Sequence, residues 1–387
     1  MVGAGAGGCA LAAALRLQGW RGAMALLEIG RGPGGRTATR RSRSERTLAI
    51  NHGAPLFNIT ASQEPRLLEP LRRGGWITPF SGAIGSLDEH GRLGAALSND
   101  PLCSGSLWQG SPHMDDLCRG LLALAQQRTP TRLISGTLVR QLATQPSGWT
   151  LRDSQGETLL HSRWLVLSGT LLAHPRCQTV FGWDEVPLQV AADQSGDLQL
   201  QQACKVLAAL PSMASSNLLL NLPASIAAAW RQQPWRLLQF NGAAQEHWGI
   251  RRVSLQALAR ERWGVVVESS QAFAERHLGV YGSRSSAAQV LGALPHAQAE
   301  AAVIESLDQA VQNALGLSTA GADRQLMRWG AAFPQGQGLS PVLSLCPSSR
   351  IGFCGDAIAG LGFGRVEGAL RSAETLADRL EPFLGAA

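Results

Sequence analysis

The sequence predicts an α/β protein of two domains, the second of them an α+β domain on an antiparallel sheet. Three observations support this. The chain opens with Gly3-Ala4-Gly5-Ala6-Gly7-Gly8, followed by an Ala/Leu-rich helical run and an apolar strand. A short apolar strand at 351–354 precedes Gly355-Asp356 and a long helical pattern. From about residue 172 to 338 short strands mix with helices. The first pattern is the Rossmann-like βαβ order, in which a glycine turn joins strand to helix.

The opening glycines have the spacing of a dinucleotide-binding turn. Gly3 permits the tight turn, Gly5 lets the backbone approach a pyrophosphate, and Gly8 lets the helix lie close to the strand. A helix over 9–17 then presents its positive N-terminus to the phosphates. Glu28 closes the next strand, at 24–27, and is placed to accept hydrogen bonds from a ribose diol.

A second glycine pair favours FAD over NAD as the cofactor. Gly34-Gly35-Arg36 follows Glu28 closely, and Arg36 can make a charge-assisted contact to the pyrophosphate. At the far end, Asp356 is placed to hydrogen-bond ribityl hydroxyls. The helix beginning near Arg365 is placed to stabilise a reduced flavin through its positive N-terminus.

Composition excludes several classes. The 387 residues are 45% hydrophobic and 16% charged, which suits a folded, soluble protein of two domains. No apolar run reaches the ~18 residues of a spanning helix, so we expect a cytoplasmic protein without an integral membrane segment. The seven cysteines form no CxxC pair, which favours reduced thiols and no metal site. A cluster of arginines occurs at positions 36, 40, 41, 43 and 46. Neither interleaved aromatic residues nor the motif of a known nucleic-acid-binding fold accompanies it, so we expect no nucleic-acid interface.

The remaining elements follow from periodicity and turn residues. Helices are expected over 62–73, 115–127, 271–278, 298–315 and 365–380, and a hairpin over 76–93. Strands are expected over 137–142, 149–152, 158–161, 163–168, 206–210, 237–240 and 263–268. Only Met1 and Val2 precede Gly3, so we expect either a very short central strand or a longer natural start.

With these motifs the chain resembles the flavin amine-oxidase superfamily, and most closely its renalase-like branch. The resemblance lies in residues 2–39, 51–54, 327–329 and 355–372. It implies a fold of the p-hydroxybenzoate hydroxylase or amine-oxidase type, with a discontinuous FAD-binding domain (1–75, 103–171, 340–387) and a substrate domain (76–102, 172–339). It also implies non-covalent FAD.

The resemblance assigns site residues. Those expected to bind FAD are Gly3, Ala4, Gly5, Ala6, Gly8, Glu28, Ile29, Gly35, Arg36, Gly53, Ala54, Val139, Gly355, Asp356, Gly364, Arg365, Val366 and Ala369. The candidates for the substrate pocket are His52, Arg328 and Trp329. No side chain is assigned a catalytic role, because the flavin carries the redox chemistry.

The resemblance favours a nicotinamide-like substrate over an amine. Many amine oxidases use a lysine near the flavin and an aromatic pair around the substrate, but here the only lysine is Lys205 and the only tyrosine is Tyr281. Renalase-like enzymes oxidise misreduced isomers of NAD(P)H and pass the electrons to oxygen. Relatives often carry His where this chain has Met327, and an acid where it has Asn51, so the substrate stays open.

Other functions stay open as well. A flavin amine oxidase is the first alternative, and a non-catalytic FAD-binding or redox-sensing protein is the second. A Rossmann NAD(P) dehydrogenase is weakened by the Gly34-Gly35-Arg36 and Gly355-Asp356 segments. Carotenoid-type desaturases share the motifs but have longer chains. The oligomeric state is not predicted.

Overall fold

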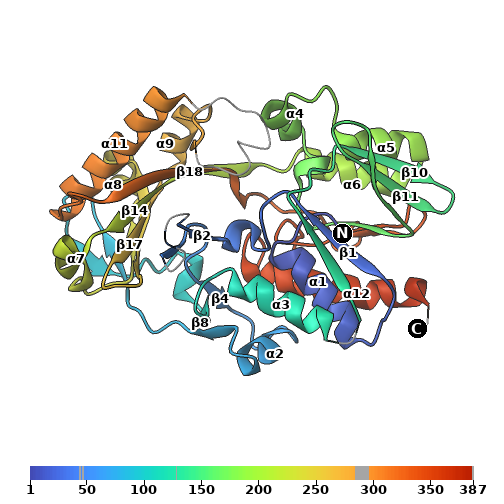
Figure 1. The fold of residues 1–387 in the computed structure, drawn as a ribbon, viewed down its shortest axis with the longest axis horizontal. Coiled ribbons are helices and arrows are strands. Elements are labelled where there is room, and N and C mark those ends of the chain that lie inside the picture. The colour runs from blue at the N-terminus through green and yellow to red at the C-terminus, as the bar shows by residue number, and fades with distance from the viewer. Residues whose placement is uncertain (43–44, 46–47, 128, 284–295, 386–387) are drawn as a thin grey trace.

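The computed structural model describes residues 1–42, 45, 48–127, 129–283 and 296–385. Two parts lie next to each other along the long axis of the molecule (Figure 1). One, here called the parallel-sheet domain, holds the sheet that begins at the N-terminus. The other, here called the seven-stranded domain, holds a seven-stranded and mostly antiparallel sheet. This architecture confirms the predicted fold class.

The central strand of the parallel-sheet domain is reduced to one residue. The surrounding strands are β1 (Met24–Glu28), β9 (Thr131–Ser135), β13 (Leu165–Leu167), β19 (Leu345–Cys346) and β20 (Ile351–Phe353). β1 pairs in parallel with β9, and β13 pairs in parallel with β20, while β19 is antiparallel to β20. Val2 forms parallel bridges to both Leu27 and Leu167. It thereby joins the two halves of the sheet.

Three helices cover one face of this sheet (Figure 1). They are α1 (Ala6–Leu17), α3 (Asp116–Gln126) and α12 (Val366–Leu384). The central helix, α1, is buried from Gly7 to Arg16, and it contacts both of the others. Its alanines and glycines leave room for this close approach, because small side chains let helices pack tightly.

Helices α5 (Pro187–Ser195) and α6 (Leu198–Ala208) correct one prediction. The strand expected over 206–210 is wrong, because most of it forms the end of α6. Leu200, Ala203, Cys204 and Leu207 are buried on one helical face, and Asp197 caps the helix by accepting from two backbone N–H groups. A short apolar run cannot be told from a buried helix segment by periodicity alone.

The predicted meander also needs correction. It consists of β10 (Gln141–Gln145), β11 (Gly148–Arg152) and β12 (Thr158–Ser162). The strand expected over 137–142 is therefore displaced, since residues 137–140 are not in a strand. β9 was not expected at all. Its sequence, Thr-Arg-Leu-Ile-Ser, lacks the apolar run typical of a buried parallel strand.

The seven-stranded domain confirms the strands expected near 237–240 and 263–268. In spatial order its strands are β18 (Asp323–Pro334), β14 (Ser212–Leu222), β17 (Trp263–Ser269), β16 (Ile250–Ala257), β15 (Leu237–Phe240), β6 (Ile84–Leu87) and β7 (Leu93–Ala95). The β6–β7 hairpin falls largely within the one expected over 76–93. The helices packed against the sheet are α7 (Ala224–Arg231), α8 (Gly242–Trp248), α9 (Gln271–Arg276) and α11 (Ala297–Leu315).

The remaining elements are short. They are β2 (Thr39–Arg41) with β3 (Ala49–Asn51), the sheet of β4 (Phe57–Ile59), β8 (Ser106–Gly110) and β5 (Ile77–Pro79), the helices α2 (Leu68–Arg73) and α4 (Arg176–Phe181), and the 3-10 turns η1 (Gly35–Thr37), η2 (Pro101–Cys103) and η3 (Leu171–Ala173). Within the arginine cluster, Arg41 forms a two-bond ion pair with the buried Asp115. Arg43 and Arg46 lie outside the described residues.

The core packing bears on the domain boundary. Buried residues of α5 and α6 share one hydrophobic cluster with β13 and β20 of the parallel-sheet domain. A separate cluster fills the space between the seven-stranded sheet and its helices. The boundary at residue 172 stays a prediction, while the packing joins α5 and α6 to the parallel-sheet side.

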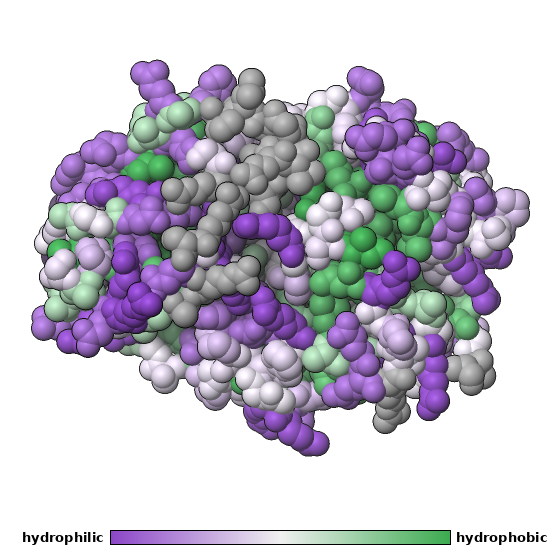
Figure 2. Space-filling model, in the orientation of Figure 1, coloured by the Kyte–Doolittle hydropathy of each residue, from purple (hydrophilic) through white to green (hydrophobic). Residues whose placement is uncertain are grey.

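The surface is uneven in hydropathy. Figure 2 shows hydrophobic side chains gathered to the right of centre, on the side of the parallel-sheet domain, while much of the rest of this face is hydrophilic. Exposed large apolar residues include Leu198, Val342 and Leu361. Within the described part of the chain, no helix combines the length and apolar character needed to cross a bilayer.

Candidate active site

A cavity of about 620 Å³ lies between the two domains. The glycine turn at the start of α1 forms part of its wall through Gly3, Gly5, Ala6 and Gly7. Gly3 has φ +98°, a conformation that glycine adopts without strain. An added Cβ at Gly8 would lie 2.2 Å from the Gly3 carbonyl oxygen, so only glycine allows this packing of helix on turn.

The N-terminus of α1 is open to an anion. Gly5 occupies the N-cap position, no side chain caps the helix, and its first turn carries no acid. The free N–H groups at such an end carry a partial positive charge. Because Gly5, Ala6 and Gly7 line the cavity, this charge is presented to whatever the cavity holds.

Glu28 ties the glycine turn to the end of β1. One carboxylate oxygen accepts the Ala4 N–H at 2.7 Å, and the other accepts the Gly30 N–H at 2.7 Å. The residue is buried, and with Ile29 it lines the cavity. A carboxylate has about four acceptor positions, so two remain for a ligand.

The Gly34-Gly35-Arg36 motif packs directly on the glycine turn. The Gly34 N–H donates to the Ala4 carbonyl at 2.9 Å, and Gly34 pairs with Gly5 in a parallel bridge. Gly53 lies against the same backbone, since its added Cβ would be 2.0 Å from the Arg36 carbonyl oxygen. The next residue, Ala54, donates its N–H to that oxygen at 2.8 Å.

Arg36 and Asp356 form an ion pair in the cavity wall. Arg36 Nη1 donates to Asp356 Oδ2 at 2.7 Å, Nη2 donates to Oδ1, and Nη1 also donates to the Ala332 carbonyl at 3.1 Å. Each was expected to contact a cofactor separately. The structure brings them together, which fixes the guanidinium in a two-bond arrangement typical of arginine and carboxylate.

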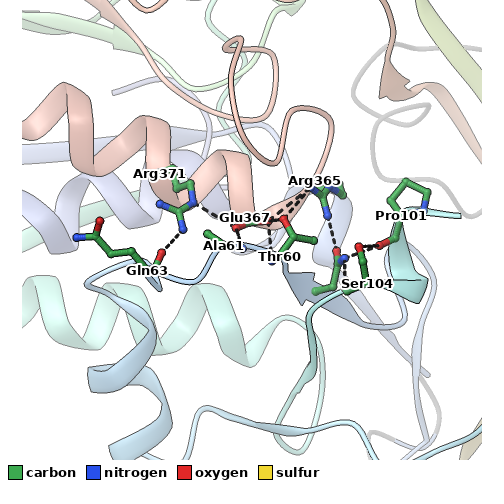
Figure 3. A network of polar contacts seen from close by, with 9 residues as sticks. Thr60, Ala61, Gln63, Pro101, Ser104, Arg365, Glu367 and Arg371 are labelled. Carbon is green, nitrogen blue, oxygen red and sulfur yellow. Dashed lines mark hydrogen bonds and ion pairs between the residues drawn. The ribbon is translucent and has the colours of Figure 1, made fainter. Parts of the chain in front are cut away.

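The N-terminus of α12 closes another side of the cavity. Gly364, Arg365, Val366 and Ala369 line it. Arg365 donates to Asn58 Oδ1 at 2.9 Å and to Thr60 Oγ1 at 3.4 Å (Figure 3). Its side chain therefore ties the helix to β4 and the segment that follows it.

The buried Glu367 holds the centre of this network (Figure 3). It accepts the Thr60 hydroxyl at 2.7 Å and the Ala61 N–H at 3.2 Å, and Arg371 Nε donates to it at 3.2 Å. Burial alone would raise the pKa of the Glu367 carboxyl, but these hydrogen bonds outweigh it and lower that pKa. The carboxylate thus fixes the start of α12 rather than facing the cavity.

Most of the expected cofactor residues line this one cavity. The exceptions are Ala4 and Gly8, which are buried and do not line the cavity. Val139 lines the cavity from the connection between β9 and β10, not from a strand. Thr137, two residues before Val139, donates its N–H to the Glu28 carbonyl at 2.9 Å, which places this connection beside the acid.

Of the three substrate-pocket candidates, only Trp329 lines the cavity. Trp329 lines the cavity and stacks on His52, with ring centroids 5.3 Å apart and planes inclined by 14°. His52 is buried behind it, and its carbonyl accepts from Trp329 Nε1 at 3.3 Å. Arg328 is not among the cavity-lining residues, and its guanidinium lies 4.4 Å from the Tyr281 ring centroid. Adjacent residues of a strand point to opposite faces.

His52 predicts a pH dependence of stability. Burial, and then the charge of Arg40, lowers the pKa of its imidazole from 6.5 to about 3. Below pH 6.5 the imidazole of His52 is protonated in the unfolded chain, but in the folded chain it stays neutral down to about pH 3. The free energy of unfolding therefore decreases as the pH is lowered across this window. We expect His52→Phe, which keeps an aromatic ring against Trp329, to remove a loss of roughly 1 kcal/mol per pH unit below 6.5.

Urea unfolding at pH 7 and pH 4.5 measures this effect. The exposed His90 supplies the control, because His90→Gln should lose stability in parallel with the parent protein. Equal losses in the parent protein and His52→Phe would contradict the buried, neutral state of His52.

Sequence reasoning missed Arg176, which also lines the cavity. Its guanidinium donates to the Thr170 hydroxyl, and no ion pair in the described part of the chain includes it. Burial, and then the charge of Arg36, lowers the pKa of this group to about 10. A partly buried cation that forms no ion pair is costly. This cost favours the binding of an anion against this wall of the cavity. No sequence signal marks this arginine.

Sequence reasoning also missed a second charged group, on the inner strands β16 and β17 of the seven-stranded sheet. Arg251, Arg252 and Glu268 all line the cavity. Their only sequence signal is the tandem Arg-Arg that opens β16.

The residues fit a dinucleotide cofactor. The open helix end and the arginines Arg36 and Arg176 offer positive charge, while Glu28 offers acceptors for a ribose. Within the described residues, no group of three or more His, Cys, Asp and Glu side chains could hold a metal ion.

Comparison with known proteins supports this assignment in part. Residues 1–73 match the model of the NAD(P)-binding Rossmann-like domain family. No curated protein matches the sequence.

Solved structures match nearly the whole chain. An oxidoreductase from Methanosarcina mazei is 11% identical, with a TM-score of 0.64 over 97% of this chain and 99% of that one. Cyclohexylamine oxidase from Brevibacterium oxydans IH-35A is 14% identical, with a TM-score of 0.62 over 99% and 98%. Wild-type putrescine oxidase bound to putrescine is 12% identical, with a TM-score of 0.57 over 98% of both chains. These likenesses confirm the amine-oxidase type of fold.

Proposed function

We propose that this chain is an FAD-dependent oxidoreductase of renalase-like function. It takes a hydride from a reduced, nicotinamide-like small molecule onto non-covalently bound FAD, and oxygen accepts the electrons. One observation carries the proposal: the glycine turn, Glu28, the Arg36–Asp356 pair and the start of α12 all face the cavity that Trp329 also lines. Cofactor and substrate residues thus share one space.

Each part of the wall has a role in this proposal. Glu28 accepts hydrogen bonds from the ribose, while the start of α1, Arg36 and Arg176 hold the pyrophosphate. Asp356 accepts from the ribityl chain, and the N-terminus of α12 stabilises negative charge. When bound, FAD supplies the two-electron acceptor.

The seven-stranded sheet provides the substrate side. Trp329 offers a flat surface that holds a planar ring in register for transfer, which depends on placement more than on an acid or base. The stacked His52 keeps that ring in position from behind. Both domains contribute residues to the cavity wall, so the substrate would lie between them.

The comparisons support the oxidoreductase class and leave the amine-oxidase alternative in place. Two of the similar structures, putrescine oxidase and cyclohexylamine oxidase, are oxidases named for amines. Lys205 and Tyr281, the only residues of their kinds, are not among those that line the cavity. This observation favours the nicotinamide-like substrate.

Anaerobic mixing tests the proposal. The purified protein should be yellow and release one FAD on heating. The panel comprises NAD(P)H, its 2- and 6-dihydro isomers, primary amines and polyamines. We expect the isomers to bleach the flavin quickly, with peroxide formed when air is admitted. Bleaching by an amine alone would select the amine-oxidase alternative. A yellow protein that no member bleaches would favour the non-catalytic alternative, and a colourless protein that takes up only NAD would refute the FAD assignment.

A further inference from the structure

The cluster of Arg251, Arg252 and Glu268 lies on the cavity face of the seven-stranded sheet. Arg251 Nη1 donates to Glu268 Oε1 at 2.7 Å, and Arg252 Nε donates to Oε2 at 2.8 Å. Glu268 and Arg252 are buried, at 4% and 9% exposure. Burial alone would raise the pKa of the Glu268 carboxyl, but the charges of Arg252 and Arg251 outweigh it and lower that pKa. The group therefore carries two positive charges and one negative.

A β-bulge brings both arginines to one carboxylate. Successive residues of a regular strand point to opposite faces, yet Arg251 and Arg252 both line the cavity. The pairing of β16 with β17 shifts register between Ile250 and Arg252. Such bulges re-aim a side chain and are frequent beside active sites.

Arg251 keeps unused donors. Within the described residues, its hydrogen-bond partner is Glu268, and its guanidinium lies 4.4 Å from the Phe333 ring centroid. Nε and Nη2 are left without a protein acceptor in that part of the chain. Its side chain is 24% exposed, so these donors can reach a ligand.

The cluster lies near the residues expected at the flavin. Glu268 pairs across the sheet with Asn217, whose side-chain N–H donates to the His52 carbonyl at 2.9 Å. His52 immediately precedes Gly53 and stacks on Trp329. Trp329 and Phe333 provide flat apolar surfaces in the same cavity.

We propose that Arg251 and Arg252 form an anion-binding subsite that anchors an acidic group, carboxylate or phosphate, of the planar, nicotinamide-like substrate. The surplus positive charge in a mostly apolar cavity is costly until an anion balances it. The guanidinium fork of Arg251 matches a carboxylate, and the nearby rings match a planar body. This inference rests on the proposed function, because that function places the cofactor beside the two arginines. Binding of an anion to the subsite can be measured without any catalytic reaction.

Titration of the FAD-loaded protein tests the subsite, because the bound cofactor then engages Arg36 and Arg176. Benzoate is the anionic probe, and benzamide is its neutral match in shape. Binding is followed by isothermal calorimetry and by the change in flavin absorbance. We expect benzoate to bind at least about tenfold more tightly than benzamide, the range of a charged hydrogen bond.

Two variants with opposite effects isolate the charge. Arg251→Gln should weaken benzoate binding by about tenfold or more and leave benzamide within about twofold. Glu268→Gln removes the competing carboxylate and should tighten benzoate binding. The exposed Arg231 at the end of α7 gives the control, since Arg231→Gln should change neither. Circular dichroism and thermal melting check that each variant is folded.

The outcomes separate this inference from the proposed reaction. The subsite would be overturned if benzoate did not bind, or if benzoate and benzamide bound equally well. It would also be overturned if Arg251→Gln weakened the binding of both probes to the same extent. Selective benzoate binding without flavin reduction by any member of the panel would retain the subsite and overturn the reaction.

Discussion

Replacing Gly53 with alanine is expected to destabilise the protein by about 3 kcal/mol, the upper part of the range for overpacking. The new Cβ would lie 2.0 Å from the Arg36 carbonyl oxygen, which is backbone and cannot rotate away. The hydrogen bond from Ala54 to that oxygen would be lost with it. Because Arg36 would move, the variant should also fail to retain FAD. Urea unfolding and the absorbance of the purified protein measure the two effects.

Gly32→Ala is the matched control for Gly53→Ala. Gly32 lies in the turn before Gly34, and its added Cβ meets nothing within 4 Å. It should change stability by only a few tenths of a kcal/mol, since no contact is strained. Similar losses in both variants would mean that the contact between the new Cβ at position 53 and the Arg36 carbonyl is not the cause of the destabilisation.

Replacing Glu28 with alanine is expected to weaken FAD binding about 100-fold or more, or roughly 3 kcal/mol. The change removes the acceptor proposed for the ribose. It also leaves the N–H groups of Ala4 and Gly30 without their carboxylate partner, which loosens the glycine turn. Fluorescence titration of the apoprotein with FAD measures the affinity.

Glu28→Gln separates the two contributions. The amide keeps one acceptor oxygen but offers an NH2 group where the other N–H donates, so we expect an intermediate affinity. The half-exposed acid Glu89, which does not line the cavity, provides a control of the same charge, and Glu89→Ala should bind FAD as the parent does. Unchanged affinity in Glu28→Ala would place the ribose elsewhere.

The glycine turn and its acid could be predicted from sequence because their chemistry is local. Gly3, Gly5 and Gly8 fix a backbone shape that few other residues allow, and Glu28 follows at a set distance along one βαβ unit. The same holds for the start of α12, where Gly364 and Arg365 precede a long amphipathic helix. Both features are encoded in short, continuous stretches of the chain. The order of strand, glycine turn and helix is therefore enough to predict that they line the cofactor cavity.

The charged residues of the walls could not be predicted in this way. Arg176 and Glu268 line the cavity only because folding brings other segments around them. The local sequence predicts a strand that ends at Glu268, but nothing in it marks either residue as part of a cavity wall. The bulge before Arg252 depends on the register of two strands. Arg328 shows the opposite case, a residue that the sequence suggests for the pocket and that does not line it. Side chains alternate between the two faces of β18, so Trp329 lines the cavity while Arg328 contacts the Tyr281 ring.

The ion pair of Arg36 with Asp356 joins residues that are 320 positions apart. A ribosome adds roughly 5–20 residues per second, so the arginine leaves the exit tunnel on the order of half a minute before its partner exists. During that time α1 has no α12 to pack against. The part of the cavity wall that this ion pair and the start of α12 form is therefore completed only after the chain has been synthesised through α12, long after the glycine turn has formed.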